Sequence, residues 1–352
     1  MKIVIAAGGS GGHLLPAQQL AEDLQNEAEI LFAGHRLNAS PFFRRDLFSF
    51  QSIPAAPLRL SLKGLFEFFK AMACGVWLSF RLIRDFQPDV VVGFGSFHSF
   101  PILLAAVLMR RKIVLFEANC LLGKVNRLFA FDAKIVAAQF VLKNHPKNLR
   151  QVPLLPWKQK MVFMEKSQAR SELGLDKDRL TFLVFGGSQG AGFLNRCIPS
   201  CLPINCQVVH LAGNDEATAA VAELYREAKI FAVVKSFESN MRLLYCAADF
   251  VVCRSGAGTM AELIRYSLPA LLIPFPFAAD DHQKANAEFL VKNIRGAAMI
   301  YEEDATLQAI IEALKTMIHE SINFRAELIR FANECEGRIS LSQQVLQIGK
   351  NI

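Results

Sequence analysis

A glycine-rich turn directly after a short apolar run occurs twice in this chain, once in each half. Gly8-Gly9-Ser10-Gly11-Gly12 follows Ile3–Ala7, and Gly186-Gly187-Ser188-Gln189-Gly190 follows Phe182–Phe185. Each run is typical of a buried parallel strand, and a helix-like pattern follows each turn. Such turns let backbone N–H groups approach an anion, and the helix N-terminus adds positive potential. The repeat therefore predicts two α/β domains that face a shared cleft.

Strand-like runs alternate with amphipathic stretches along all 352 residues, more than a single domain usually contains. The alternation predicts parallel sheets with helices on both faces. Pro153 and Pro156 mark a boundary, so we expect an N-terminal domain over 1–155 and a C-terminal domain over 156–329. The helical tail 330–352 could pack back on the first domain. The expected strands are Lys2–Ala7, Ile30–Ala33, Val90–Phe94, Ile113–Glu117, Lys134–Ala137, Thr181–Phe185, Gln207–Leu211, Phe231–Val234, Phe250–Cys253 and Ala270–Pro274.

Positive charge is concentrated in the first half of the chain. Residues 1–155 contain 18 Lys and Arg against 10 Asp and Glu (+8), and the rest contains 21 against 22 (−1), which gives the total of +7. This excess predicts an anionic partner for the N-terminal domain. No basic cluster is interleaved with aromatic residues as in nucleic-acid-binding modules, so an anionic membrane surface is favoured over nucleic acid.

The cysteines and the N-terminus suggest a protein that stays in a reducing cytosol. None of the eight cysteines forms a C-x-x-C pair, and most lie in apolar surroundings, as free buried thiols do. Strand-like sequence begins at once, so no signal peptide is expected.

An apolar stripe at helical spacing runs through Leu62–Phe80. Core packing is one interpretation of it. The other is an interfacial helix on anionic lipid, because cations flank its aromatic residues. No apolar run is long enough to cross a bilayer. The candidate membrane contacts are Lys63, Leu65, Phe66, Phe69, Lys70 and Trp77.

His13 ends the first glycine turn and is the leading candidate for a general base, although a purely structural helix-capping role stays open. An imidazole takes up a proton near neutral pH, and a helix N-terminus favours its neutral form. The turn is not a P-loop, because no Lys-Ser or Lys-Thr follows. His98, in the turn Gly93–Ser99, is a rival base, and Glu117, at a strand end with Asn119, could serve as a base or bind a sugar hydroxyl.

Two polar stretches in the second half also follow strands and open helices. The small residues within Cys253–Thr259 would let a ligand approach the backbone closely. Glu262 lies one helical turn later, where its carboxylate could accept hydrogen bonds from ribose hydroxyls, as the acidic residue of dinucleotide-binding folds does. Asp280–Gln283 opens another helix; one aspartate could cap it, and we do not expect a metal there.

On these motifs the chain resembles the MurG family, in order and over essentially its whole length. The first glycine loop of that family corresponds to Gly8–His13 and its second to Gly93–Ser99. Its third corresponds to Gly186–Gly190, and its Cys-Arg-Ser-Gly-Ala and Asp-His-Gln-x-x-Asn-Ala stretches to Cys253–Ala257 and Asp281–Ala287.

The resemblance implies a GT-B fold, with two Rossmann-like, doubly wound parallel-sheet domains, and an inverting glycosyltransferase. The family moves N-acetylglucosamine from UDP-GlcNAc to the 4-hydroxyl of the muramyl sugar of lipid I, which gives lipid II for peptidoglycan and links it to cell shape and division. It implies a peripheral protein on the cytoplasmic face of the bacterial plasma (inner) membrane, with lipid I, UDP-GlcNAc and the anionic membrane surface as partners. No tightly bound cofactor or metal site is implied, although Mg²⁺ could assist.

The resemblance also assigns roles to individual residues. His13 and Glu117 become the catalytic candidates. The backbone near Phe237 and Glu238 would contact uracil, and Glu262 the ribose. The full set of expected substrate contacts is Ser10, Gly11, Gly12, Gly93, Gly95, Ser96, Asn119, Ser188, Gln189, Phe237, Glu238, Arg254, Ala257, Gly258, Thr259, Glu262, His282 and Gln283.

Three departures from the family pattern bear on these roles. Phe116-Glu117-Ala118-Asn119 replaces the usual His-Glu-Gln-Asn, which leaves the catalytic load on Glu117 and Asn119. Gln151–Leu155 replaces Gly-Asn-Pro-Val-Arg, so the arginine expected near the nucleotide is absent. Ser96 replaces a glycine of the second loop. Another GT-B UDP-sugar transferase, acting on a lipid or natural-product acceptor, and an inactive nucleotide-sugar-binding scaffold remain the alternatives.

Overall fold

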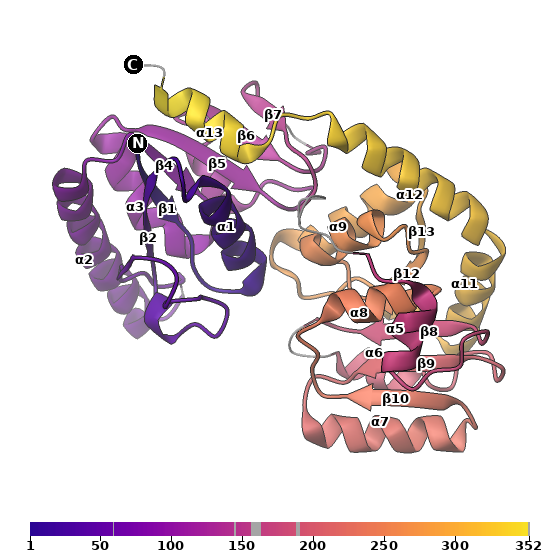
Figure 1. Cartoon of the computed structure of the whole chain (residues 1–352). Helices are drawn as coiled ribbons and strands as arrows, with labels where there is room; N and C mark the ends of the chain where they lie inside the picture. The colour runs from indigo at the N-terminus through magenta and orange to yellow at the C-terminus, as the bar shows by residue number, and fades with distance from the viewer. Residues whose placement is uncertain (59, 144–145, 156–162, 188–190, 351–352) are drawn as a thin grey trace. The chain divides into compact units, whose positions relative to one another are not determined.

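The computed structural model describes residues 1–58, 60–143, 146–155, 163–187 and 191–350. The chain forms two compact units. One comprises Met1–Leu155 with Gly337–Ile352, and the other comprises Pro156–Glu336. Each unit is a parallel sheet covered by helices (Figure 1), as the alternation of strand and helix patterns predicts.

The first unit is built on a sheet in the order β3-β2-β1-β4-β5-β6-β7. Its central strands are continuous apolar runs such as Val90–Gly93, which suits strands buried on both faces. The strands are β1 (Lys2–Ala6), β2 (Glu29–Gly34), β3 (Phe50–Ser52), β4 (Val90–Gly93), β5 (Lys112–Glu117), β6 (Ile135–Ala138) and β7 (Leu149–Gln151). The helices are α1 (Gly11–Leu24), η1 (Leu37–Ala39), α2 (Leu62–Phe86), α3 (Ser96–Leu108), α4 (Lys124–Phe129) and α13 (Leu341–Lys350).

The second unit repeats this plan with the order β10-β9-β8-β11-β12-β13. Its strands are β8 (Thr181–Phe185), β9 (Gln207–Leu211), β10 (Phe231–Lys235), β11 (Phe250–Cys253), β12 (Ala270–Leu272) and β13 (Ala297–Met299). Its helices are α5 (Lys166–Glu172), α6 (Gly192–Cys197), α7 (Asp215–Glu227), α8 (Met241–Ala247), α9 (Ala257–Arg265), η3 (Ala279–Asp281), α10 (His282–Glu288), η4 (Phe289–Ile294), η5 (Glu302–Asp304), α11 (Leu307–His319) and α12 (Ser321–Glu336).

Both predicted glycine turns follow the strand at which the sheet order reverses. In the first unit β1 lies between β2 and β4, and in the second β8 lies between β9 and β11. Open α/β sheets bind ligands outside the carboxyl ends of the strands at such a reversal. The topology therefore places one candidate site on each unit, at β1/β4 and at β8/β11.

The last helix belongs to the first unit. Lys112 Nζ, at the start of β5, donates to the carbonyl of Ile348 in α13 at 2.9 Å, and α13 lies against the strands of this unit (Figure 1). Gly349 packs closely on the first residue, because a Cβ there would lie 2.0 Å from the sulfur of Met1 and the Met1 side chain would have to move. The boundary expected after residue 329 falls inside α12, which continues without a break to Glu336.

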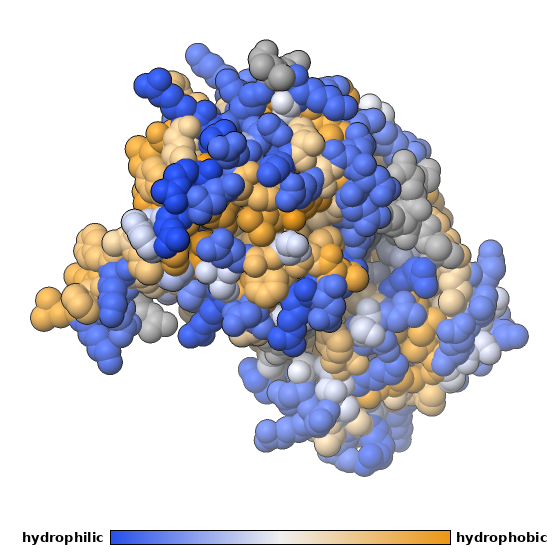
Figure 2. Space-filling model, turned by 60° about the vertical axis from the view of Figure 1, so that its left-hand side comes forward, coloured by the Kyte–Doolittle hydropathy of each residue, from blue (hydrophilic) through white to orange (hydrophobic). Residues whose placement is uncertain are grey.

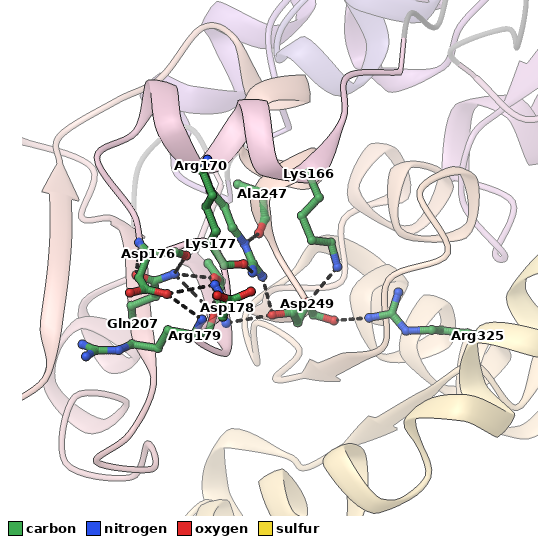
Figure 3. Close-up of polar contacts among 11 residues, drawn as sticks. Lys166, Arg170, Asp176, Lys177, Asp178, Arg179, Gln207, Ala247, Asp249 and Arg325 are labelled. Atoms are coloured by element: carbon green, nitrogen blue, oxygen red, sulfur yellow. Dashed lines mark hydrogen bonds and ion pairs between the residues drawn. The ribbon is translucent and has the colours of Figure 1, made fainter.

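A partly buried ion-pair network centred on Asp249 ties the amino ends of β8 and β11 together (Figure 3). The Asp249 carboxylate accepts from Lys166 Nζ at 2.7 Å, from Arg170 Nη2 at 2.6 Å and from the Thr181 amide at 2.9 Å. Arg325 Nη2 in α12 donates to the Asp249 carbonyl at 2.7 Å. Burial alone would raise the pKa of Asp249, but the Lys166 and Thr181 hydrogen bonds and the Arg170 charge lower it. The network joins α5, α12, β8 and β11.

Candidate functional site

In the first unit His13 links the turns after β1 and β4. α1 begins at Gly11, directly after Ser10, and the His13 amide bonds the Ser10 carbonyl at 3.1 Å. His13 Nδ1 donates to the Phe94 carbonyl at 2.7 Å. A ring nitrogen that bonds a carbonyl must carry the proton, so the lone pair lies on Nε2. The imidazole is therefore oriented with its basic nitrogen away from the backbone of Phe94.

The second glycine turn is conformationally strained. Gly95 has φ +80° and Ser96 has φ +64°, and the Ser99 hydroxyl donates to the Gly95 carbonyl at 2.7 Å. A left-handed conformation is costly for a residue with a Cβ. This explains why a glycine suits the position that Ser96 occupies. Gly93 lies deeper, where a Cβ would come within 2.9 Å of the Leu103 side chain.

The Glu117 carboxylate is buried and is surrounded by hydrogen-bond donors. It accepts from the Asn119 amide at 3.1 Å, from Asn119 Nδ2 at 3.0 Å, from the Gly123 amide at 3.0 Å and from Asn126 Nδ2 at 3.0 Å. These four N–H groups occupy both oxygens of the carboxylate. The arrangement suits Glu117 to orienting Asn119.

Asn126 is a site residue that sequence reasoning missed. Its Nδ2 also donates to the Phe116 carbonyl at 2.9 Å, so Asn126 holds both the backbone before Glu117 and the Glu117 carboxylate. Nothing in the sequence pairs residues 117 and 126, because a loop separates them and the contact depends on its folded path.

In the second unit Arg254 is held within the protein. Its Nη1 donates to the carbonyls of Ile273 and Pro274 at 3.0 and 3.2 Å, and its Nη2 lies 2.5 Å from Glu302 Oε2. The guanidinium is buried and lies over the Phe275 ring. These contacts support the loop after β12, and the substrate contact expected of Arg254 stays a prediction.

The first turn of α9 presents backbone amides beside Glu262. α9 follows Gly256 and begins at Ala257, and a Cβ on Gly258 would meet nothing within 4 Å, so the backbone there is open to a ligand. Thr259 lies in the same turn, half-buried. This turn combines an open helix N-terminus with a carboxylate one turn later.

Glu262 is a desolvated carboxylate with a buried tyrosine beside it. Tyr245 Oη donates to Glu262 Oε2 at 2.8 Å, and Tyr245 is itself buried under the Tyr266 ring. Burial raises the pKa of Glu262 to about 7, while the Tyr245 hydrogen bond lowers it. Tyr245 was missed from the sequence, because it lies in an apolar helix 17 residues away.

The polar stretch that opens α10 is bound to the turn after β11. Ser255 Oγ donates to the Gln283 carbonyl at 2.7 Å, and Asn286 Nδ2 donates to the Ser255 carbonyl at 3.0 Å. Gln283 Oε1 accepts from the Phe275 amide at 3.0 Å, and His282 Nδ1 donates to the Ala279 carbonyl at 2.6 Å. The structure therefore brings Gln283 beside the loop that precedes α9.

Asp280 and Asp281 take left-handed conformations, both with φ +55°. Such strain in non-glycine residues is concentrated at functional sites. Neither the expected cap nor a metal cluster is seen among the described residues.

The loop after β10 supplies the residues expected near uracil. Phe237 is exposed, and Glu238 accepts from Lys235 Nζ at 2.7 Å and from the Asn240 amide at 2.8 Å. The Lys235 and Asn240 hydrogen bonds lower the pKa of Glu238. Ser188 and Gln189 lie outside the described residues. Leu155, where an arginine was expected, is buried in the first unit.

The stripe of α2 divides between core and surface. Phe66, Phe69 and Trp77 are 69%, 64% and 56% exposed, whereas Met72 is 8% exposed. Lys63 and Lys70 are exposed and Leu65 is half-buried. In the space-filling view a group of apolar side chains projects from the surface at the left (Figure 2). Over the described residues no helix has both the length and the apolar character needed to span a bilayer.

Two family models together match most of the chain. The glycosyltransferase family 28 N-terminal domain matches residues 3–138, and the C-terminal domain of that family matches residues 181–348. Among curated proteins, the UDP-N-acetylglucosamine--N-acetylmuramyl-(pentapeptide) pyrophosphoryl-undecaprenol N-acetylglucosamine transferase of Protochlamydia amoebophila is 39% identical, over 90% of this chain and 87% of that protein. The protein of the same name from Chlamydia muridarum is 33% identical, over 88% and 87%.

Solved glycosyltransferases share the fold. The crystal structure of Acinetobacter baumannii MurG superposes with a TM-score of 0.75 at 24% identity and covers 100% of this chain and 99% of that one. The Streptomyces glycosyltransferase SsfS6 superposes with a TM-score of 0.67 at 13% identity, over 99% and 100%. The predicted fold class, two parallel-sheet units of the GT-B type, is confirmed.

Proposed function

The chain belongs to the MurG family of glycosyltransferases, and we propose on this basis that it moves N-acetylglucosamine from UDP-GlcNAc to the muramyl sugar of lipid I. The product is lipid II, the precursor of peptidoglycan. The observation that carries this function is the 39% identity to a transferase of that name over 90% of the chain. Both sheet reversals also carry glycine turns suited to anionic phosphates.

His13 is the proposed general base. Its Nδ1 bond to Phe94 leaves the lone pair on Nε2, whereas the Glu117 carboxylate is occupied by four N–H donors. Nε2 takes the proton of the acceptor's 4-hydroxyl as that oxygen forms its bond to C1 of the donor sugar. The bond from C1 to the UDP oxygen breaks, the electron pair leaves with UDP, and C1 is inverted.

The donor is proposed to bind the second unit. Glu262 accepts the ribose hydroxyls, and the open amides of Ala257, Gly258 and Thr259 face the pyrophosphate. These preorganised donors offset the charge that grows on the leaving UDP. Mg²⁺ could assist without a dedicated protein site. Phe237 and Glu238 are proposed to contact uracil, His282 and Gln283 the sugar, and Asn119 the reacting sugar from the first unit.

The acceptor and the membrane are assigned to the first unit. The turns with Gly11, Gly12 and Gly95 are proposed to bind the diphosphate of lipid I. Exposed Phe66 and Phe69 beside Lys63 and Lys70 are suited to an anionic bilayer surface. We propose that the protein acts as a peripheral enzyme on the cytoplasmic face of the inner membrane.

The test is UDP release with defined acceptors. The purified protein is given UDP-GlcNAc with a lipid I analogue, with diacylglycerol, or with neither. We expect release with the lipid I analogue alone. Release with diacylglycerol but not with lipid I would assign the chain to another lipid glycosyltransferase.

A further inference from the structure

His98 packs against the glycine turn of the first unit. It lies in the first turn of α3, and a Cβ on Gly8 would come within 2.8 Å of its Cβ. A Cβ on Gly9 would come within 2.8 Å of its Nε2. The two glycines therefore leave room for this imidazole, which reaches the turn that opens α1.

Neighbouring rings fix the plane of the His98 imidazole. The Phe97 ring stacks on it with centroids 3.9 Å apart, and the His35 ring stacks on it at 5.6 Å. Burial, together with the nearby His35 and His13, lowers the pKa of His98 to about 4. The imidazole is therefore neutral at physiological pH and is a weak base, which removes it as a rival to His13.

The proton of the neutral His98 ring belongs on Nε2. Nδ1 is enclosed and has no hydrogen-bond partner among the described residues. A buried N–H without a partner is rarer in proteins than an unpaired acceptor, so Nδ1 carries the lone pair. Nε2 is not among the enclosed atoms, and no described group hydrogen-bonds to it. Its N–H donor lies beside Gly9 at the opening of the turn.

We propose that His98 is a specificity-determining residue for the acceptor, whose Nε2–H donates a hydrogen bond to a phosphate oxygen of the diphosphate bound at Gly8–Gly12. The inference rests on the proposed function for the identity of that acceptor. The stacked rings set the direction of the donor in advance, which lowers the entropic cost of forming the bond. A neutral donor also adds no positive charge beside His13, where a cation would oppose proton uptake.

Three variants separate hydrogen bonding from packing. His98→Phe keeps a ring and removes the N–H, His98→Asn restores an N–H donor on a smaller side chain, and His319→Phe repeats the first change on an exposed surface of the second unit. Each is checked for a wild-type thermal unfolding transition and wild-type UDP affinity. Inorganic pyrophosphate is then titrated calorimetrically with UDP saturating, so that the nucleotide site is filled, and KM and kcat are measured with a lipid I analogue.

We expect His98→Phe to weaken pyrophosphate binding and to raise the acceptor KM about tenfold, which corresponds to about 1.4 kcal/mol. His98→Asn should recover part of both effects, with kcat changed less than KM. If His98→Phe keeps pyrophosphate affinity and acceptor KM within twofold of wild type, the inference is wrong and the ring is a packing element. If pyrophosphate binding falls as expected but the wild type never uses lipid I, the phosphate contact stands and the proposed function fails.

Discussion

The raised pKa of Glu262 predicts that donor binding depends on pH. The carboxylate titrates at about 7 in the unliganded protein, because burial disfavours its charge. Ribose hydroxyls donate to the ionised form, so the donor binds that form and lowers its pKa. Between pH 8 and pH 5.5 the ionised fraction falls from about 0.9 to about 0.03, which should weaken UDP-GlcNAc binding about 30-fold. UDP-GlcNAc suits this test because each of its phosphates carries one ester and one anhydride bond, has no second ionisation and stays ionised across the range.

Calorimetric titration from pH 5.5 to pH 8 measures this dependence directly. Near pH 6 binding should release close to one proton, seen as a binding enthalpy that changes with the ionisation enthalpy of the buffer. Glu262→Gln should bind more weakly at pH 8, by about 1–3 kcal/mol, and should lose the pH dependence. Tyr245→Phe should move the midpoint upward, because the Tyr245 hydrogen bond lowers the pKa of Glu262. A flat profile for the wild type, or the same slope for Glu262→Gln, would refute the reasoning.

The same pKa has a consequence for stability with a definite sign. The folded pKa lies above the usual value of 4.5, so the folded protein holds this proton more tightly than the unfolded chain. Stability contributed by the protonated carboxyl is present below pH 4.5 and is lost as the pH rises through 7. Glu262→Gln should therefore raise the free energy of unfolding at pH 8 by about 1–3 kcal/mol. The substitution would thus stabilise the fold while weakening donor binding, a trade-off that is common at binding sites.

Three further predictions concern other parts of the molecule. His13→Ala should lower turnover about 10²–10⁴-fold with donor affinity unchanged, as measured by UDP release. Replacing Phe66 and Phe69 with Ser should reduce binding to vesicles of anionic lipid without lowering the melting temperature, because both rings are exposed. Asp249→Asn should destabilise the second unit by about 2–4 kcal/mol in urea unfolding at pH 7, because it leaves Arg170 buried without its ion pair. The difference should persist down to pH 3.8, the usual pKa of an aspartate, and should be lost only as the pH falls further through the lowered pKa of folded Asp249.

Matched substitutions serve as controls for these three. His319→Ala should keep full turnover, and loss of activity in Glu117→Gln but not in His13→Ala would move the base to Glu117. Ile322→Ser, on an exposed face of the second unit, should leave vesicle binding unchanged. If the Phe66 and Phe69 variant instead loses its cooperative unfolding transition, the stripe is core. Asp178→Asn, also exposed, should change stability by less than about 0.5 kcal/mol.

The fold was predictable where the signal is local. Apolar runs before Gly8 and Gly186 define the two reversal strands, because a buried strand and a tight turn each depend on a few consecutive residues. The edge strands β3, β7 and β13 were missed, since each spans three residues and is only partly buried or exposed, whereas β12, equally short, is fully buried and lies in an apolar run.

Hydrogen-bond partners that depend on folded contacts were not predictable. Glu117 and Arg254 were marked by their motifs, but Asn126 and Glu302, which contact them, lie outside those motifs. The Glu262 pKa depends on Tyr245 and on burial, neither of which a motif records. The sequence therefore showed which polar residues lie at the ends of strands. It did not show which hydrogen-bond partners those residues have in the folded protein.

The place of α13 has a consequence for the order of events during synthesis. The chain leaves the first unit at Leu155, completes the second, and returns only with the last residues, where Gly349 meets the sulfur of Met1. A ribosome therefore releases every residue of the second unit before the first can be complete. Until α13 is synthesised, the surface of the N-terminal sheet that α13 covers stays exposed. The exposed surface can bind chaperones or misassemble. Lesions that remove α13 would thus damage the unit formed mainly by residues 1–155.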